Sequence, residues 1–478
     1  MVRMADQRLP GLVAPVTAIG PGELPLFPCP QGIDPGLQNF LDGASQLLCQ
    51  WLGDSHLHGP RPGLSLQPSA EPGQDGKEAA ALLADLQKLM AGGFRPNHPG
   101  ALAHLDPPPL SVSIAADLIA AGMNNNLLAE ELSPSLSRLE RGLCAWLAQT
   151  LGLGAEASGV PASGGSLSNL MALVCARRAA GLQGRSDAVV ITGAASHVSL
   201  EKALGVMGLP LESLCRLPLD PQGRLQAEAV AAALGRCRQR GVPVIAVVAT
   251  AGSTVQGLVD PLQELAAVCG TEGVWLHVDG AIGAVCGLVD SQRWRVRGIG
   301  AADSLTLNPQ KLLGVSKPSS LLLLRNPQHL QDSFGTGLPY MEPAHAGAHG
   351  GELGLQGTRG AEVLKLWLSL QHLGLEGIAT LLEGAFQRAE GLRQRLAPLP
   401  VALLPGDLHL VSFANQGPDQ GWRDGCHRRL LQGGFWLSKP DLAGQPLLKA
   451  VLGNPFTTDQ HLDQLAALVQ QSCMGKTK

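Results

Sequence analysis

The chain has 478 residues, of which 45% are hydrophobic and 15% charged, and its formal net charge is −4. This composition is typical of a globular, soluble protein with more than one domain, and it excludes a disordered chain or a basic nucleic-acid-binding protein. No stretch is apolar for the roughly 18 residues that a membrane span needs, the N-terminus lacks signal-peptide features, and the 10 cysteines are scattered. We therefore expect a cytoplasmic protein with reduced thiols and without nucleic-acid or membrane partners.

The first 110 residues are predicted to form an N-terminal segment. Its Pro/Gly-rich stretches are interrupted by helical patterns at 37–52 and 77–90. Two further helices are predicted at 111–123 and 133–152, the second opening with Ser-Pro, a common helix start.

From about residue 160, short apolar runs alternate with longer helical patterns. Strands are predicted at 188–192, 244–250, 274–279, 304–308 and 320–324, and helices at 166–181, 197–208, 225–241 and 260–273. Strands that are apolar throughout and separated by helices indicate a mainly parallel sheet covered on both faces. We therefore predict an α/β domain at 111–365, with its ligand site outside the carboxyl ends of the strands.

The remaining chain, 366–478, is predicted to be a smaller α+β domain. Two long helical patterns at 361–374 and 377–399 are followed by a strand at 408–415 and a closing helix at 457–471.

Three features of the predicted α/β domain carry chemistry. In PASGGSLSNLMAL (161–173), Gly164 and Gly165 let the backbone approach a ligand, and Ser163 can add a hydroxyl at a helix N-terminus that favours anions. Asp279 ends a buried strand, and Lys311 follows another, where its charge is costly to bury without a partner. Each has a plain alternative, since a Ser/Gly segment and a strand-end Asp both cap helices. Together, an anion site, a carboxylate and a lysine suit pyridoxal 5′-phosphate, whose phosphate, pyridine nitrogen and aldehyde need these groups.

The motifs also resemble those of a known family. Nine stretches stand in the order found in group II pyridoxal-phosphate decarboxylases. They are HPGALAHLDPPP, MNNNLLAEELSPSLSRLE, ASGGSLSNLMAL, SHVSLEKA, VVATAGSTVQGLVDPL, LHVDGAIGA, NPQKLLG, LQGTRGAEVLKLWL and LGNPFTT. This family includes glutamate, aromatic amino acid, cysteine sulfinate and 2,4-diaminobutyrate decarboxylases. The resemblance covers about 95–460 and implies a fold-type I transferase-like architecture.

The resemblance also implies roles for single residues. Lys311 would form the Schiff base and Asp279 would pair with the pyridine nitrogen. Ala281 and His197 would contact opposite ring faces, and Thr250 would lie near the ring hydroxyl. The remaining cofactor neighbours would be Ser163, Gly164, Gly165, Ser304, Asn308 and Gln310. The substrate neighbours would be Arg359, Asn124 and His98, although Arg359 could instead form an ion pair at a helix start and Asn124 could cap a helix.

Three positions depart from the family pattern. The family has His where this chain has Gln310, and Ala where it has Gly280, a change we expect to be tolerated. Many members also carry a loop tyrosine that protonates the carbanion, and its place falls near Ala344. We expect His345, His349 or Tyr340 to replace it as proton donor, unless the histidines are ordinary loop residues.

The product and substrate follow from these positions. Without a proton donor the product would be an aldehyde rather than an amine, and a cofactor-binding protein with little turnover is a further alternative. The stretch AHLDPPP resembles 2,4-diaminobutyrate decarboxylases, while acidic and aromatic substrates stay open. The family implies a homodimer whose partner loop completes the site and whose N-terminal helices wrap the partner. We predict no metal site.

Overall fold

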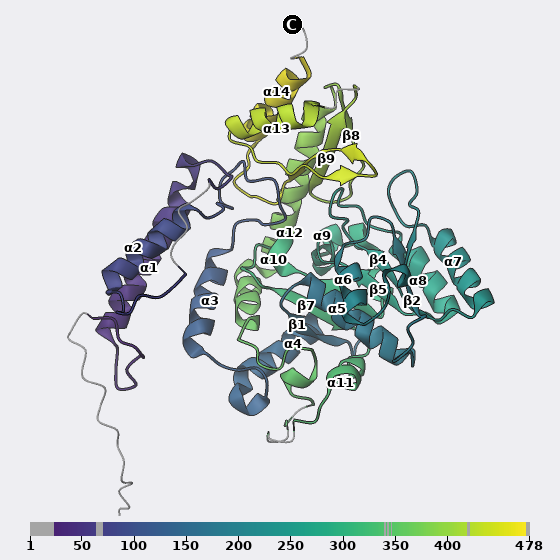
Figure 1. Ribbon diagram of the computed structural model, residues 1–478, viewed down its shortest axis with the longest axis horizontal. Coiled ribbons are helices and arrows are strands. Elements are labelled where there is room, and N and C mark those ends of the chain that lie inside the picture. The colour runs from purple at the N-terminus through teal and green to yellow at the C-terminus, as the bar shows by residue number, and fades with distance from the viewer. Residues whose placement is uncertain are drawn as a thin grey trace, which may run out of the picture. The chain divides into compact units, whose positions relative to one another are not determined.

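The computed structural model describes residues 23–63, 70–338, 341, 344–345, 347–417 and 421–474. The chain forms two compact units, Met1–His98 and Pro99–Lys478. In the first unit, helices α1 (Pro35–Gly53) and α2 (Ala79–Ala91) pack against each other and confirm the two predicted helices (Figure 1). Asp34 caps α1 by accepting the Leu37 N–H, and the Trp51 indole donates to the Met90 carbonyl at 2.6 Å.

The second unit is built on a seven-stranded sheet in the order β1-β7-β6-β5-β4-β2-β3. Its strands are β1 (Ser158–Ala162), β2 (Val189–Gly193), β3 (Leu214–Leu217), β4 (Val244–Thr250), β5 (Leu276–Asp279), β6 (Ser304–Leu307) and β7 (Ser320–Leu324). Neighbours from β3 to β6 are parallel, and β7 runs antiparallel to both β6 and β1. All five predicted strands are confirmed. β1 and β3 were not predicted, because SGVPA contains Gly and Pro and LCRL is short and interrupted by Arg.

Helices cover both faces of this sheet, as predicted. Val247 and Val278 belong to one core with residues of α4 (Pro134–Thr150), α7 (Ala227–Arg240), α8 (Leu262–Glu272) and α12 (Val363–Leu396). Val248 packs in a second core with residues of α5 (Gly165–Ala179) and α6 (Ser199–Val206). The helices of this part are α3 (Ser111–Met123), α4 (Pro134–Thr150), α5 (Gly165–Ala179), α6 (Ser199–Val206), α7 (Ala227–Arg240), α8 (Leu262–Glu272), α9 (Asp290–Arg293), α10 (Pro309–Leu312) and α11 (Gln328–Phe334). Short 3₁₀ helices are η1 (Asp54–Leu57) in the first unit and η2 (Glu130–Leu132), η3 (Leu211–Ser213), η4 (Ala284–Leu288), η5 (Trp294–Val296), η6 (Ile299–Ala301) and η7 (Gly350–Glu352) in the second.

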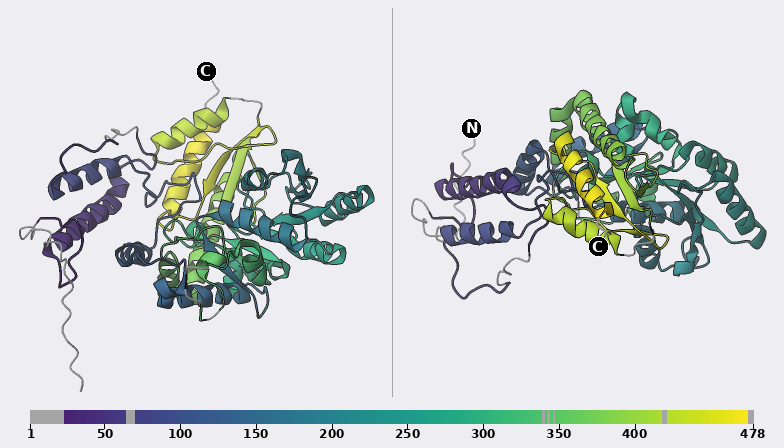
Figure 2. Two further views of the ribbon diagram at one scale, coloured as in Figure 1. Left: turned by 60° about the horizontal axis from the view of Figure 1, so that its bottom comes forward. Right: turned by 90° about the horizontal axis from the view of Figure 1, so that it is seen from above.

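A smaller antiparallel sheet, in the order β12-β9-β8, follows toward the C-terminus. Its strands are β8 (Val401–Leu403), β9 (Leu410–Asn415) and β12 (Leu448–Val451), next to the short pair β10 (Asp441–Leu442) and β11 (Gln445–Pro446) and helices α13 (Trp422–Gln432) and α14 (Asp459–Met474). α14 packs against α12 (Val363–Leu396) (Figure 2). Gly374, with φ 59° and ψ 178°, interrupts α12 and separates the two predicted helices.

The long helix α12 joins the two sheets of the second unit. Its residues up to Phe386 pack in the core of the large sheet, and those from Ala389 onward pack in the core of the small sheet. The domain limits at 110 and 365 stay a prediction. The second limit falls inside α12, which belongs to both cores. In the part of the chain that the structure describes, no helix combines the length and apolarity needed to cross a bilayer.

Candidate active site

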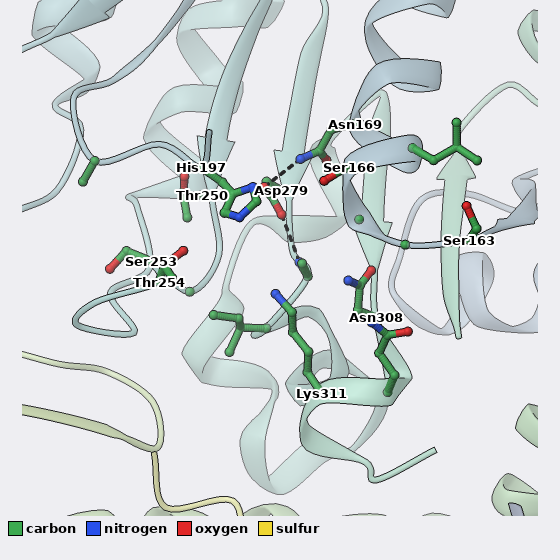
Figure 3. Close-up of a pocket in the computed structure, with 18 residues that line it drawn as sticks. Ser163, Ser166, Asn169, His197, Thr250, Ser253, Thr254, Asp279, Asn308 and Lys311 are labelled. Atoms are coloured by element: carbon green, nitrogen blue, oxygen red, sulfur yellow. Dashed lines mark hydrogen bonds between the residues drawn. The ribbon is translucent and has the colours of Figure 1, made fainter. Parts of the chain in front are cut away.

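A cavity of about 440 Å³ lies at the carboxyl ends of β4, β5 and β6. Thr250 and Asp279 face each other in the register of β4 and β5, where the parallel strands end. Ten of the predicted cofactor residues line this cavity together (Figure 3): Ser163, Gly164, Gly165, His197, Thr250, Asp279, Ala281, Asn308, Gln310 and Lys311. These residues come from segments far apart in the sequence, so the fold creates the site that the separate motifs indicated.

One end of the cavity is made of neutral hydrogen-bond donors. Helix α5 begins at Gly165, so its first N–H groups have no partner within the helix and point out of its N-terminus. Gly164 has φ 154°, a backbone conformation that favours glycine. A Cβ on Gly165 would lie 2.9 Å from Asn308 Nδ2, so a side chain there would fill the space that a ligand needs.

Two amide side chains complete this end of the cavity. Asn308 Oδ1 accepts the Ser320 hydroxyl at 2.6 Å, and Gln310 Oε1 accepts the Ser319 N–H at 2.6 Å. With both carbonyl oxygens bound to the start of β7, the NH₂ groups are the atoms left to face the cavity. The Gln at position 310 therefore keeps donor capacity, but no charge, where the family has His.

The opposite end of the cavity contains a buried carboxylate. Asp279 ends β5, and its Oδ2 accepts Asn169 Nδ2 at 2.8 Å while its Oδ1 accepts the Ala281 N–H at 3.2 Å. Both donors bind the carboxylate from the protein side and leave lone pairs for a ligand.

Lys311 lies between the two ends of the cavity. Its side chain rises from α10 into the space between Asp279 and Asn308 (Figure 3). Burial lowers its pKa below the usual value, although the charges of Asp279 and Asp106 raise it. Among the described residues, no carboxylate lies within 4.0 Å of its amine. A partly buried amine with a lowered pKa and no ion-pair partner among the described residues is suited to act as a nucleophile.

His197 lines another wall of the cavity, just before α6. Its Nδ1 accepts the Ser199 N–H at 3.2 Å, so the neutral ring carries its proton on Nε2. Burial lowers the pKa of His197, the charge of Asp279 raises it, and Lys311 lowers it. The ring is therefore neutral near pH 7 and can donate a hydrogen bond from Nε2.

These residues fit pyridoxal 5′-phosphate. The N-terminus of α5, the hydroxyls of Ser163 and Ser166 and the two amides would hold the phosphate without any opposing carboxylate at that end. Asp279 would hold the pyridine nitrogen, and Lys311 lies between them to bind the aldehyde carbon.

Ser304 and Arg359 have other surroundings than predicted. Ser304 begins β6, at the end opposite to Asn308, where it accepts the Trp275 indole N–H and contacts His277. Arg359 donates two hydrogen bonds to the Glu140 carboxylate, at 2.7 and 2.9 Å. Neither residue lines the cavity. Ser304 is therefore not proposed as a phosphate ligand, and Arg359 adopts the ion-pair alternative.

Four more predicted residues, Asn124, His98, His345 and His349, lie outside the lining of this cavity. Asn124 is exposed and caps α3 in the left-handed conformation, with φ 46°. His98 ends the first unit. His345 is exposed and its N–H donates to Glu130 Oε2, whereas His349 is buried and its Nδ1 accepts the Glu130 N–H. Tyr340 falls outside the described residues.

The cavity also contains residues that sequence reasoning did not assign. Ser253 and Thr254 follow β4 and face the cavity across from Asn308 (Figure 3). Asn169 lies one turn inside α5 and contacts Asp279. Asn169 could have been identified from the sequence, because it places an amide among apolar residues in a helix that begins at the anion site.

Comparison with known proteins agrees with this geometry. Residues 62–412 match the family model of the pyridoxal-dependent decarboxylase conserved domain. The chain is 30% identical over 383 residues to an aromatic-L-amino-acid decarboxylase of Bacillus atrophaeus, covering 77% of this chain and 80% of the relative. It is 32% identical over 330 residues to an L-2,4-diaminobutyrate decarboxylase of Rhizobium meliloti (strain 1021), covering 67% and 66%. The Oryza sativa TDC structure with PLP and tryptamine superposes with a TM-score of 0.87 at 20% identity, covering 94% of this chain and 100% of that one.

The fold and the site thus define a fold-type I enzyme that uses pyridoxal 5′-phosphate. The chain belongs to the pyridoxal-dependent decarboxylase family and is an amino acid decarboxylase.

Proposed function

We propose that the protein decarboxylates L-2,4-diaminobutyrate to its amine and CO₂. The reaction type is supported chiefly by one observation, the convergence of Lys311, Asp279 and His197 on a single cavity. The substrate is supported by the AHLDPPP stretch and by the 32% identity to a diaminobutyrate decarboxylase. A relative of similar identity acts on aromatic amino acids, so the substrate requires a direct test.

The residues of the cavity divide the work of decarboxylation. Pyridoxal 5′-phosphate, when bound, supplies an electron-accepting ring for the pair left by the departing CO₂. Asp279 stabilises a proton on the pyridine nitrogen and thereby strengthens this acceptor. Lys311 would hold the cofactor through its aldehyde carbon until a substrate amine takes that place. His197 would pack against the ring, and its Nε2–H could orient the substrate carboxylate.

The source of the final proton decides between two products. The family places a loop tyrosine near position 344, which is Ala in this chain. We propose His345 or His349 of the same loop as the acid, acting in a homodimer in which one subunit's loop completes the partner's cavity. The alternative product, an aldehyde, is favoured by the alanine at 344, because this side chain supplies no acid. In that reaction O₂ would take up two electrons and become H₂O₂, and water would release the amine nitrogen as ammonia.

We also propose a cytoplasmic location. All ten cysteines are free thiols, and most are partly or fully buried, which supports a reducing compartment.

A substrate panel with added pyridoxal phosphate tests these proposals together. Purified protein is given diaminobutyrate, glutamate, aspartate and aromatic amino acids, and CO₂, amine, aldehyde and peroxide are followed. Amine and CO₂ in equal amounts from diaminobutyrate alone would support the proposal. Aldehyde with peroxide would replace the amine product, and preferred turnover of another amino acid would replace the substrate.

A further inference from the structure

Asn169 is the centre of a buried polar cluster behind Asp279. Its side chain is 1% exposed and makes four hydrogen bonds. Nδ2 donates to Asp279 Oδ2 at 2.8 Å and to Ser199 Oγ at 2.9 Å. Oδ1 accepts Thr306 Oγ1 at 2.7 Å and His277 Nε2 at 3.0 Å. All the hydrogen-bonding capacity of the amide is therefore used, and one bond reaches the carboxylate of the active site.

The direction of these hydrogen bonds is fixed from both sides of the cluster. An indole N–H can only donate, so Trp275 Nε1 donates to Ser304 Oγ at 2.8 Å. On the other side, the Asp279 carboxylate binds the Asn169 NH₂ group, so the Asn169 oxygen faces His277 Nε2 and Nε2 must donate. His277 Nδ1 is then the acceptor of the Ser304 hydroxyl proton, 2.9 Å away. The neutral ring of His277 therefore carries its proton on Nε2 and donates to Asn169. Burial lowers the pKa of His277 to about 4, which is consistent with a neutral ring.

This order of donors leaves one orientation for the Asn169 amide. If the amide were flipped, its oxygen would face Asp279 Oδ2 at 2.8 Å, and its NH₂ group would face the donors of Thr306 and His277. Both contacts would be repulsive in a buried site, where unmatched polar groups are costly. The NH₂ group must therefore face Asp279.

We infer that Asn169 is a positioning residue that holds the Asp279 carboxylate aimed at the pyridine nitrogen of the cofactor, and that Asn169 is itself held by the Trp275–Ser304–His277 relay. The second N–H of the Asn169 amide connects this cluster to the wall of the cavity that contains His197. Ser199 accepts this N–H, and the Ser199 backbone N–H in turn holds His197 Nδ1. One amide thus orients both the carboxylate and the histidine.

Asn169→Asp tests the inference with little change in shape. The new carboxyl would face Asp279 at hydrogen-bond distance, and two such groups share one proton instead of both ionising. We expect the ¹⁵N NMR signal of ring-labelled pyridoxal phosphate bound to Asn169→Asp to move from the protonated toward the unprotonated position. The dissociation constant of the cofactor should rise about tenfold or more, as for other supporting groups. Neither measurement requires a substrate, so the result is independent of the proposed substrate.

Thr306→Val is the matched control. It removes one donor to Asn169 Oδ1 but leaves the hydrogen bond from His277, so the orientation of the Asn169 amide is kept. The pyridine nitrogen of the cofactor should therefore stay protonated. A protonated ring nitrogen and unchanged cofactor affinity in Asn169→Asp would overturn the inference, as would equal shifts in Asn169→Asp and Thr306→Val.

A second pair of variants applies if Asn169→Asp fails to fold in urea-denaturation assays of the apo-protein. His277→Gln can still donate an N–H to Asn169, whereas His277→Leu cannot. We expect the ring-nitrogen signal to shift in His277→Leu and to be restored in His277→Gln. Wild-type signals in both variants would contradict the relay.

Discussion

Lys311 and Arg359 are both partly buried cations of the second unit, but their surroundings differ. Arg359 binds both oxygens of Glu140, and although burial lowers its pKa, the charge of Glu140 raises it above the usual value. Lys311 has no such partner among the described residues, and its pKa is lowered by burial. A charge that is used in an internal pair holds the fold together, whereas a charge kept without a partner in a cavity is available to a ligand. Burial alone does not distinguish these two uses.

The largest expected effect is on Lys311. Lys311→Ala should reduce turnover by about 10³-fold or more, because it removes the nucleophile that holds the cofactor covalently. CO₂ release and covalent cofactor retention after borohydride reduction measure this. The control is Lys317→Ala, whose half-exposed side chain pairs with Asp106. Equal losses in both variants would mean that Lys311 has no special role.

Breaking the Glu140–Arg359 pair should affect stability rather than chemistry. Glu140→Gln leaves a buried guanidinium without its counter-charge, which costs about 3–5 kcal/mol. The double variant Glu140→Met with Arg359→Met should recover most of this loss. Urea unfolding of the apo-proteins gives the free energies. If Glu140→Gln kept its stability but lost turnover, Arg359 would belong with Lys311 in the active site.

Gly280 tests the packing beneath the cavity, at the position where this chain has Gly and the family has Ala. A Cβ there would lie 2.7 Å from Ala284 Cβ and 2.8 Å from both Leu305 Cδ1 and Thr306 O. Gly280→Ala should therefore destabilise the protein by about 1–3 kcal/mol and weaken cofactor binding. Gly205→Ala in α6, which has open space, is the control and should be neutral or stabilising. Equal unfolding midpoints for the two variants would contradict this packing argument.

His409 gives the smallest expected effect and one that depends on pH. Burial lowers its pKa to about 3, and the charges of Arg388, Lys311 and Lys449 lower it too. The unfolded state, with a pKa near 6.5, binds the proton first, so stability is complete above pH 6.5 and is lost as the pH falls toward 3. His409→Leu should reduce the stability difference between pH 7.5 and pH 5 by about 2 kcal/mol. Urea unfolding at pH 7.5 and pH 5 measures these free energies. A stability difference in His409→Leu equal to that of the wild type would contradict the prediction.

The sequence was sufficient to predict the α/β class, most helices and ten of the residues that line the cavity. Buried strands such as 244–250 are apolar throughout, and Gly-rich turns at strand ends mark where ligands bind, so local patterns carry this information. The strands missed, β1 and β3, are short and contain Gly, Pro or Arg, and only pairing with β7 and β2 makes them strands.

Only the tertiary structure decided which polar residues face the cavity. The sequence presents Arg359, Ser304 and Asn308 alike, as polar residues in family motifs. In the fold, Arg359 meets Glu140, which lies 219 positions away, and Ser304 meets Trp275 at the far end of its strand. Asn308 has its oxygen bound by Ser320, so its NH₂ group is left for a ligand. The role of each polar atom depends on which partner satisfies it, and those partners come from distant parts of the chain.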